Sequence, residues 1–354
     1  MTTPMNAFNA SALGAFIESP LGARGVPGFA SVWKFSSAGV LLARYDTGGS
    51  AYAIAVDSNG DVVVGGDRVN SSCVWKLNSA LSSLAWDYDT GGFIKGIAVG
   101  PSDKVYATGE VIDSGTVDAK SGWILNSSGS LVHGFIGRLI AADNHAGASN
   151  DIAVNADGDY FLSYDVGSLN PASGATRIDS DNVQQEVFAN IPIYGVDIAD
   201  ELEEEPNNPY CYLVLWVDFG DEWLVKKYRL GFGQARNGWA TDTAVDVAHD
   251  SNGGCTVACH HNGGDSVIHF VDDGDSLEID WAASTGDDAS RIALDSSDRV
   301  YLAGKRSEAS SYKSVWKFNA SGVLQWAADT GGHAYGIAVD GSGNVYVAGE
   351  RIAA

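Results

Sequence analysis

The chain has 354 residues, with 21 Lys or Arg against 45 Asp or Glu, so its formal net charge is −24. This charge argues against binding of nucleic acid through the phosphate backbone and against docking on an anionic membrane, because both need a surplus of basic residues. No run of roughly 18 apolar residues occurs, so no membrane insertion is expected. The 43 Gly residues and the 45% hydrophobic content favour short strands joined by tight turns over a disordered chain.

Residues 1–30 form an arm that does not share the repeat found in the rest of the chain. The arm is apolar and carries only Glu18 and Arg24 as charged residues. Because no basic residue precedes Arg24, the charged start of a secretory signal is missing, and we expect synthesis in the cytoplasm. A free apolar tail is unusual on a soluble monomer, so the arm should either fold back over the propeller or dock on another chain, and we favour docking on a protein partner. Its candidate docking residues are Phe8, Leu13, Phe16, Ile17 and Leu21.

A repeat begins directly after the arm. Residues 31–57 read SVWKFSSAGVLLARYDTGGSAYAIAVD, and residues 314–340 read SVWKFNASGVLQWAADTGGHAYGIAVD. A third copy, CVWKLNSALSSLAWDYDTGGFIKGIAV, stands at 73–99. Each unit of roughly 47 residues holds four short runs of Val, Ile, Trp and Tyr separated by turn residues, which is the content of one β-propeller blade. Weaker copies align on the AIAVD segment, which gives seven units, at residues 53–57, 96–100, 151–155, 195–199, 246–250, 291–295 and 336–340.

The pattern GIAVD-x-x-G-x-V-Y-V-A, at residues 336–348 and in substituted form at 53–65, resembles the NHL and related seven-bladed β-propeller families. The resemblance covers roughly residues 31–354. It implies that GIAVD is the innermost strand A, VYVA strand B, SVWKF strand C and LLARYDT the outer strand D. The expected fold is therefore all-β, a seven-bladed propeller at 31–354 with four antiparallel strands per blade.

The order of these strands predicts how the ring closes. The repeat region begins with strands C and D, at residues 32–35 and 41–46, and ends with strands A and B, at 335–340 and 345–350. One blade should therefore take two strands from each end, which removes the open sheet edge. Four Trp residues at equivalent C-strand positions should pack between sheets. They are Trp33, Trp75, Trp123 and Trp316.

Two repeated motifs look like catalytic or metal-binding signatures. Asp-Thr-Gly, at residues 46–48, 89–91 and 329–331, matches the active-site triplet of aspartic proteases, but its place at the end of strand D in separate blades favours a strand-capping turn. The A–B turns at 57–61, 155–159 and 340–344 resemble calcium loops. They have Gly at position 4 and lack the EF-hand Glu, which favours ordinary hairpin turns.

Cys255, Cys259, His260 and His261 form the sharpest local cluster. Period-2 alternation places Cys255, Cys259 and His261 on one strand face, where they could begin a zinc site, and His260 on the other. The two cysteines are about 13 Å apart along an extended strand, too far for one metal ion or for a disulfide. Buried packing cysteines are the better interpretation, so we expect no metal and no cofactor.

Long connections mark the candidate recognition face. The B–C segments at 111–120 and 163–173 and the D–A segments at 139–150 and 231–243 should emerge on the same face. The opposite face carries an acidic insertion, DELEEEPNNP at 200–209, interpreted as a solvated charge cluster, with an ion or basic-partner site as the alternative. The candidate binding residues of the loop-rich face are Asp143, Asn144, His145, Arg236 and Trp239.

No nucleophile elbow, zinc-protease motif or phosphate-binding loop occurs, so the sequence favours a non-enzymatic structural or interaction protein. The segment SPLGA at 19–23 is similar to the starts of some bacteriophage structural proteins, which favours an arm-anchored virion surface or tail-associated component. One alternative is a propeller that binds a glycan or receptor, with Trp239 stacking on a sugar ring. Another is a lyase or hydrolase whose site is built by polar residues of several blades at the central channel.

Overall fold

The computed structural model describes residues 28–111, 121–135, 148–165, 174–182, 184–189, 193–199, 210–217, 222–229, 234–240, 243–261 and 264–353. The docking residues of the arm lie outside these ranges. So do Asp143, Asn144 and His145 of the loop-rich face, and the acidic insertion at 200–209.

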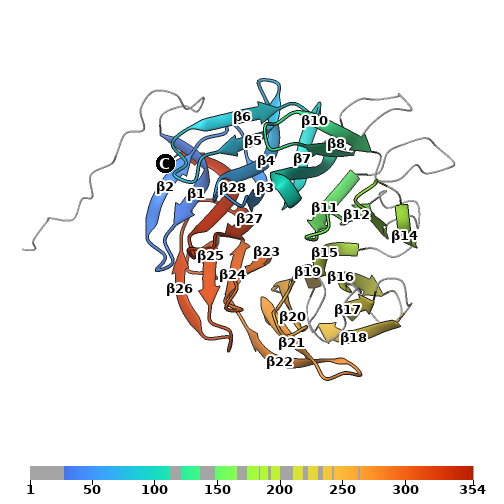
Figure 1. Ribbon diagram of the computed structural model, residues 1–354. Coiled ribbons are helices and arrows are strands. Elements are labelled where there is room, and N and C mark those ends of the chain that lie inside the picture. The colour runs from blue at the N-terminus through green and yellow to red at the C-terminus, as the bar shows by residue number, and fades with distance from the viewer. Residues whose placement is uncertain are drawn as a thin grey trace, which may run out of the picture.

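The described residues form seven antiparallel four-stranded sheets arranged in a ring (Figure 1). The innermost strand of each sheet contacts the innermost strands of the next sheets, all the way round. The chain is thus a seven-bladed β-propeller, as the repeat predicted. Its inner strands are β3 (Ala51–Val56), β7 (Gly92–Gly100), β11 (Ala148–Val154), β15 (Ile193–Ala199), β19 (Thr243–His249), β23 (Ala289–Leu294) and β27 (Ala334–Val339).

The other strands follow outward in chain order within each blade. The second strands are β4 (Val62–Val69), β8 (Lys104–Val111), β12 (Tyr160–Asp165), β16 (Tyr210–Val217), β20 (Cys255–His260), β24 (Val300–Gly304) and β28 (Val345–Ala353). The third strands are β1 (Phe29–Phe35), β5 (Ser72–Leu77), β9 (Gly122–Leu125), β13 (Gly174–Ile178), β17 (Glu222–Arg229), β21 (Val267–Asp272) and β25 (Val315–Phe318). The outer strands are β2 (Leu41–Tyr45), β6 (Leu84–Tyr88), β10 (Leu131–Phe135), β14 (Gln184–Ala189), β18 (Gln234–Ala240), β22 (Leu277–Ala283) and β26 (Leu324–Ala328).

The closing blade confirms the predicted two-plus-two arrangement. Its strand order is β2-β1-β28-β27, so the two ends of the propeller pair with each other. In the register of β1 and β28, Trp33 lies opposite Val347, and Phe29 lies opposite Ala353. The first strand therefore begins two residues before the expected boundary at Ser31.

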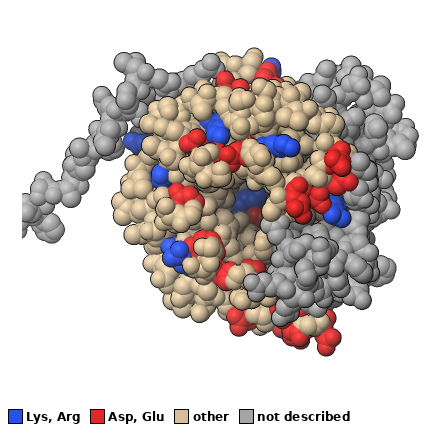
Figure 2. Space-filling model, viewed as in Figure 1, with Lys and Arg blue, Asp and Glu red and all other residues tan. Residues whose placement is uncertain are grey.

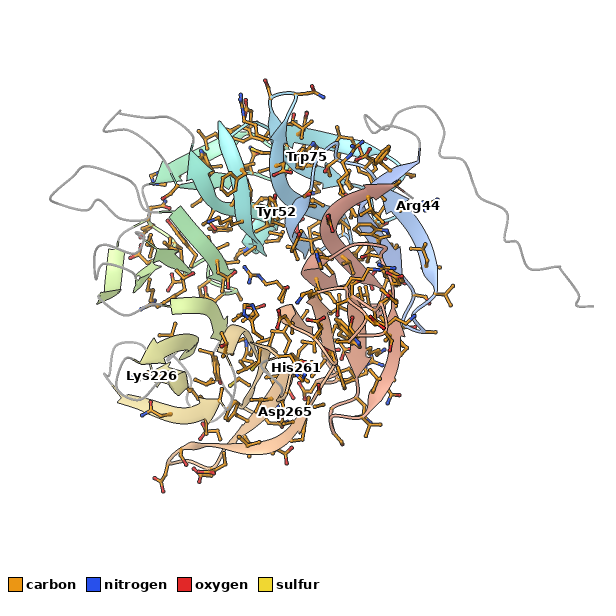
Figure 3. All side chains as sticks on the ribbon, turned by 180° about the vertical axis from the view of Figure 1, so that it is seen from behind. Arg44, Tyr52, Trp75, Lys226, His261 and Asp265 are labelled. Carbon is orange, nitrogen blue, oxygen red and sulfur yellow. The ribbon has the colours of Figure 1, made fainter. Side chains whose placement is uncertain are left out.

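The core lies between neighbouring blades, as expected of a propeller. The four C-strand Trp residues are nearly fully buried. Trp75 lies within the ring of sheets (Figure 3), where it shares a cluster with Val32 and Tyr346 of the closing blade. Burying each such side chain stabilises the fold by about 1.5–3 kcal/mol.

A second set of Trp residues joins the outer strands of adjacent blades. The indole Nε1 of Trp86 donates to the Ser127 carbonyl in the next blade, at 3.0 Å. The indole also covers Gly129, whose φ is +82° and where a Cβ would lie 2.6 Å from the ring. The same hydrogen bond joins Trp281 to Ala320 and Trp326 to Ser37.

Some expected connections are shorter than the sequence suggested. Strand β12 extends to Asp165 and β11 begins at Ala148, so parts of the segments at 163–173 and 139–150 are strand. The segment at 231–243 contains the outer strand β18. The dipeptide Asn237-Gly238 is typical of a turn, but Gly238 lies within β18 and is buried. A Cβ there would lie 2.9 Å from Leu277 and Phe270 of the next blade, so this glycine allows close packing.

Candidate functional site

A bulge in each inner strand aims side chains into the centre of the ring. The register between the inner and second strands shifts by one residue at the same point of every repeat. A bulge bends the strand and redirects the side chains around it. The residues that directly follow the bulge are Ala53, Gly96, Asp151, Gly195, Asp246, Arg291 and Gly336.

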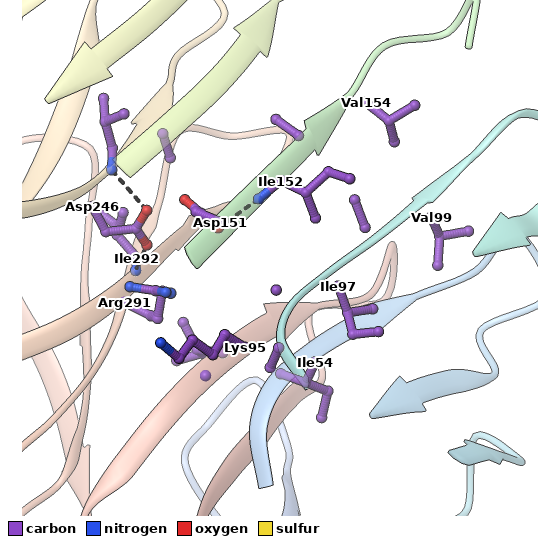
Figure 4. Close-up of a pocket in the computed structure, with 18 residues that line it drawn as sticks. Ile54, Lys95, Ile97, Val99, Asp151, Ile152, Val154, Asp246, Arg291 and Ile292 are labelled. Carbon is purple, nitrogen blue, oxygen red and sulfur yellow. Dashed lines mark hydrogen bonds between the residues drawn. The ribbon is translucent and has the colours of Figure 1, made fainter. Parts of the chain in front are cut away.

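The centre of the ring holds a cavity of about 270 Å³ (Figure 4). Figure 2 shows basic side chains in the hollow at the centre of the disc. Among the described residues, the charged lining consists of Lys95, Asp151, Asp246 and Arg291. An apolar layer surrounds these charged side chains. In each blade that contributes to the lining, the second residue after the bulge is apolar. This layer consists of Ile54, Ile97, Ile152, Val247, Ile292 and Ile337.

Asp246 connects two neighbouring inner strands. Its Oδ1 accepts a hydrogen bond from the Val247 backbone N–H at 3.0 Å, and its Oδ2 accepts one from the Ile292 N–H on β23 at 2.9 Å. Burial raises the pKa of Asp246 to about 8. Arg291 opposes this shift, whereas the charge of Asp151 adds to it.

Arg291 stays cationic inside the cavity. Burial alone would lower the pKa of its guanidinium, but the charges of Asp151 and Asp246 outweigh burial and raise it. Its Nη1 donates to the Ser290 carbonyl at 3.1 Å. The cavity therefore combines fixed positive charge, carboxylates and an apolar wall within a small volume.

One feature of the sequence could have predicted this charged cluster: a charged residue at a position of the repeat that is otherwise small. In the aligned inner strands, the residue before the first Ile is small in three copies, AIAVD, GIAVG and GIAVD. In DIAVN it is Asp151, and in RIALD it is Arg291. A charged residue at a position that is elsewhere small marks a departure from the repeat. Which of these side chains share the cavity depends on the closed ring and on the bulges, and the alignment alone does not show this.

The Asp-Thr-Gly triplets are strand-capping turns, as predicted. The Asp46 Oδ1 accepts from the Gly48 N–H at 2.8 Å, and the Thr47 hydroxyl donates to the Gly49 carbonyl at 2.9 Å. Gly48 has a φ of +94°, which favours glycine. The copies at 89–91 and 329–331 repeat these contacts on other blades, so the carboxylates are not paired as a protease would need.

Each of these Asp residues also receives two hydrogen bonds from an Arg at the end of the second strand of its own blade. Such paired contacts between guanidinium and carboxylate are strong and directional. The pairs are Arg68 with Asp89, Arg306 with Asp329, and Arg351 with Asp46.

The blade of β19–β22 replaces both members of this pair. His261 stands at the position of the Arg, and Ser284 at the position of the Asp, with 3.4 Å between His261 Nδ1 and the Ser284 hydroxyl. The Cys255–His261 cluster is therefore a variant of the structural repeat. Within the described residues, no group of three or more His, Cys, Asp or Glu side chains is arranged to hold a metal ion.

The described cysteines Cys73, Cys255 and Cys259 are buried, as was predicted for Cys255 and Cys259. Cys73 has a structural role, because its Sγ accepts from the Thr90 N–H at 3.2 Å in the turn after strand D. Ser31 and Ser314 make the equivalent contact in their blades. Burial raises the pKa of the Cys73 thiol, although hydrogen bonds from Thr90 oppose this, so it is a poor nucleophile.

The A–B turns are hairpin turns, as predicted, in which an Asp or Asn side chain accepts from the backbone. The Asp57 Oδ1 accepts from the N–H groups of Asn59 and Asp61, both at 2.9 Å. The Asp340 Oδ1 accepts in the same way in the closing blade. The carboxylate oxygen that a calcium loop would offer to an ion is thus used by the turn itself.

The rim of the propeller exposes apolar side chains at the start of several outer strands, among them β2, β10 and β26, and those of β2 and β26 lie on adjacent blades. Val40 and Leu42 of the closing blade are 60% and 53% exposed, and Val323 of the adjacent blade is 57% exposed. Leu41 and Leu324 are also exposed. Successive strand residues point to opposite faces, so exposure of both Leu41 and Leu42 means that this strand end protrudes from the ring. We call these five residues the apolar rim.

Two predicted binding residues lie in a strand rather than in a connection. Arg236 and Trp239 belong to β18, the outer strand of its blade. A role of these residues in binding a glycan or receptor stays a prediction, which Trp239→Ala would test on a glycan array. Among the described residues, no helix has the length and apolarity needed to cross a membrane.

Fold and site together define a β-propeller assembled from sequence repeats, and comparison with known proteins agrees. Residues 333–350 match a family model described as "Beta-propeller repeat". No curated protein matches the chain.

Solved structures with the same architecture are distant in sequence. A Bacteroides caccae protein of unknown function is 14% identical, with a TM-score of 0.52 over 79% of this chain and 98% of that one. Kuenenia stuttgartiensis hydrazine synthase is 12% identical, with a TM-score of 0.60 over 87% and 100%. A Xanthomonas campestris gluconolactonase is 16% identical, with a TM-score of 0.50 over 73% and 84%. At these identities the likeness shows the fold alone.

Proposed function

We propose that this protein is a non-enzymatic interaction propeller and a subunit of a larger assembly, such as a virion surface or tail-associated component. In this proposal residues 1–30 attach each propeller to a protein partner. The observation that carries the proposal is the apolar rim, because contiguous exposed apolar surface is typical of interaction sites.

The two parts of the rim lie on adjacent blades that are joined by a hydrogen bond. The indole of Trp326, on the blade that carries Val323 and Leu324, donates to the carbonyl of Ser37 in the turn that precedes Val40. The two hairpins therefore touch, and their exposed apolar side chains lie at neighbouring strand ends. Covering such side chains is favourable by about 25 cal/mol for each Å² removed from water.

The occupant we propose for the rim is the arm of a second copy of this chain. Arm and rim are both apolar, and the arm carries only two charged residues. The arm joins the propeller at Phe29, in the same closing blade as Val40. The 28 residues before Phe29 could extend about 90 Å, enough to reach a neighbouring propeller. A chain with a net charge of −24 repels its copies, so apolar contacts would have to supply the attraction.

Charged substitutions in the rim test this proposal. We expect the full chain to sediment as an oligomer and the double variant Leu42→Lys/Val323→Lys to sediment as a monomer, because lysine would have to be desolvated in the contact. The single variant Val323→Lys should weaken association in part, and Gln325→Lys is its matched control: it adds the same single charge two residues away without removing apolar surface, and it should associate like the unmodified chain. Association of the double variant at unchanged affinity would show that the rim is not the contact.

A further inference from the structure

We propose that the central cavity binds a small hydroxycarboxylate, with the guanidinium of Arg291 holding its carboxylate. This is a ligand site inside the ring, separate from the assembly contacts on the rim.

Arg291 has donor capacity left over. A guanidinium carries five N–H donors in a planar fork. Within the described part of the chain, Arg291 makes one hydrogen bond, from Nη1 to the Ser290 carbonyl. The Arg residues at the blade ends use their forks differently, since each gives two hydrogen bonds to one Asp. The half-buried Arg291 instead presents its fork to the cavity, and such a fork matches the two oxygens of a carboxylate.

The surrounding charges favour a ligand with one negative charge and with hydroxyl groups. Lys95 is the extra residue of the bulge in β7, and it extends toward the same space as Arg291 (Figure 4). Asp151 and Asp246 line the same cavity and can accept hydrogen bonds from ligand hydroxyls. Because burial raises the pKa of Asp246, the cavity carries a positive balance near neutral pH. With Lys95 and Arg291 positive and Asp151 negative, a ligand with one carboxylate neutralises the cavity, whereas a doubly charged phosphate would leave an uncompensated negative charge in a partly buried site.

The size of the cavity limits the ligand to a few carbon atoms. Its volume of about 270 Å³ lies just below the usual range of pockets for drug-sized ligands, roughly 300–1,000 Å³. The apolar layer, with Ile54 and Ile337, excludes some water and would strengthen an ionic contact with Arg291.

Calorimetric titration of the full chain at pH 7 tests the proposal, with glycerate as the probe and glycerol as its neutral match. We expect glycerate to bind with a millimolar or tighter Kd and glycerol to give no heat of binding. Arg291→Lys keeps the charge but loses the fork, so it should weaken glycerate binding tenfold or more. Arg299→Lys, a matched change outside the cavity, should leave the Kd unchanged.

A second variant tests the cavity without changing Arg291, so that a loss of binding cannot be due to a structural effect of the Arg291 substitution. Lys95→Met removes the second positive charge of the lining while keeping a side chain of similar length, and it should weaken glycerate binding while the melting temperature stays near that of the unmodified chain. The proposal is overturned if glycerate does not bind, if glycerol binds equally well, or if inorganic phosphate binds more tightly than glycerate. Equal affinity of glycerate for Arg291→Lys and the unmodified chain would also overturn it.

Discussion

The guanidinium of Arg351 donates two hydrogen bonds to the carboxylate of Asp46, from Nε to Oδ1 and from Nη2 to Oδ2, each at 2.7 Å. Arg351 lies in β28, near one end of the chain, and Asp46 directly follows β2, near the other. Arg351 also lies over the ring of Phe29, the first residue of β1, at 4.3 Å from its centroid. One side chain therefore ties the two outer strands of the closing blade to β28, where the ring closes.

Replacing Arg351 by lysine should weaken this closure. Arg351→Lys keeps the charge but loses the two-pronged contact with Asp46, whose side chain is only 4% exposed. We expect a loss of about 1–2 kcal/mol in the free energy of unfolding, measured by urea denaturation. Arg306→Lys is the matched control. Its partner Asp329 is 34% exposed, so the loss there should be below about 1 kcal/mol. Equal losses in the two variants would contradict a special role of the closing pair.

The Arg–Asp pairs should make stability sensitive to acid. Burial raises the pKa of Asp329, but hydrogen bonds from Arg306 and the Gly331 N–H outweigh burial and hold it below its usual range. A carboxylate with a lowered folded-state pKa stabilises the fold above its unfolded value, about 3.9, and this contribution is lost as the pH falls through the folded value. Asp329→Asn should therefore be less stable than the unmodified chain at pH 7, and this gap should shrink as the pH falls below about 3.9. A stability gap that does not change with pH would contradict this assignment.

Asp246 should have the opposite pH dependence. Burial raises its folded-state pKa to about 8, so between about pH 4 and pH 8 the folded state holds a proton that the unfolded state has lost. Stability from this group is therefore greatest at low pH and falls as the pH rises to about 8.

We expect Asp246→Asn to lose this dependence, so that its free energy of unfolding changes less between pH 6 and pH 9 than that of the unmodified chain. Asp103→Asn is the control. Hydrogen bonds from Ser58 hold the pKa of Asp103 below its usual range, so it does not titrate in this window. An unchanged slope in Asp246→Asn would show that another group is responsible.

The contact between Trp86 and Gly129 should tolerate no added side chain. In Gly129→Ala the new Cβ would lie 2.6 Å from the indole, and the φ of +82° is strained for alanine. Gly274→Ala has a similar strain, with a φ of +101°, but meets no atom within 4 Å. Strain alone costs about 1–2 kcal/mol in both variants, and the clash should add about 1–3 kcal/mol in Gly129→Ala alone. Equal melting temperatures of the two variants would show that the contact between Trp86 and the new Cβ adds no cost to the strain.

The repeat predicted most of the fold, because the information that defines a blade is local. The AIAVD segments identified all seven inner strands, and Trp33 and its equivalents are buried as expected. Closure followed from the order of strands at the two ends. Strand β18 was missed because Asn237-Gly238 has the composition of a turn, whereas the glycine serves close contact with Phe270 of the next blade.

The candidate ligand site was predicted only in general terms. The repeat predicts a central channel where polar residues of several blades could meet, but it does not single out Arg291 or Asp246. Neighbouring inner strands lie about 45 residues apart in the chain, as the contact between Asp246 and Ile292 shows. The bulges determine which side chains face the cavity. The turn and strand patterns that predict the fold do not predict where the bulges lie.

The most direct test of the central claim, that the arm joins propellers into an assembly, is light scattering after size-exclusion chromatography. The full chain should be compared with a variant lacking residues 1–27, which keeps all of β1 and the contact of Phe29 with Arg351. We predict an oligomeric mass for the full chain and a monomeric mass for the shortened one, with the same melting temperature for the propeller. A monomeric mass for both would contradict the claim, and so would an oligomer of unchanged size after the arm is removed.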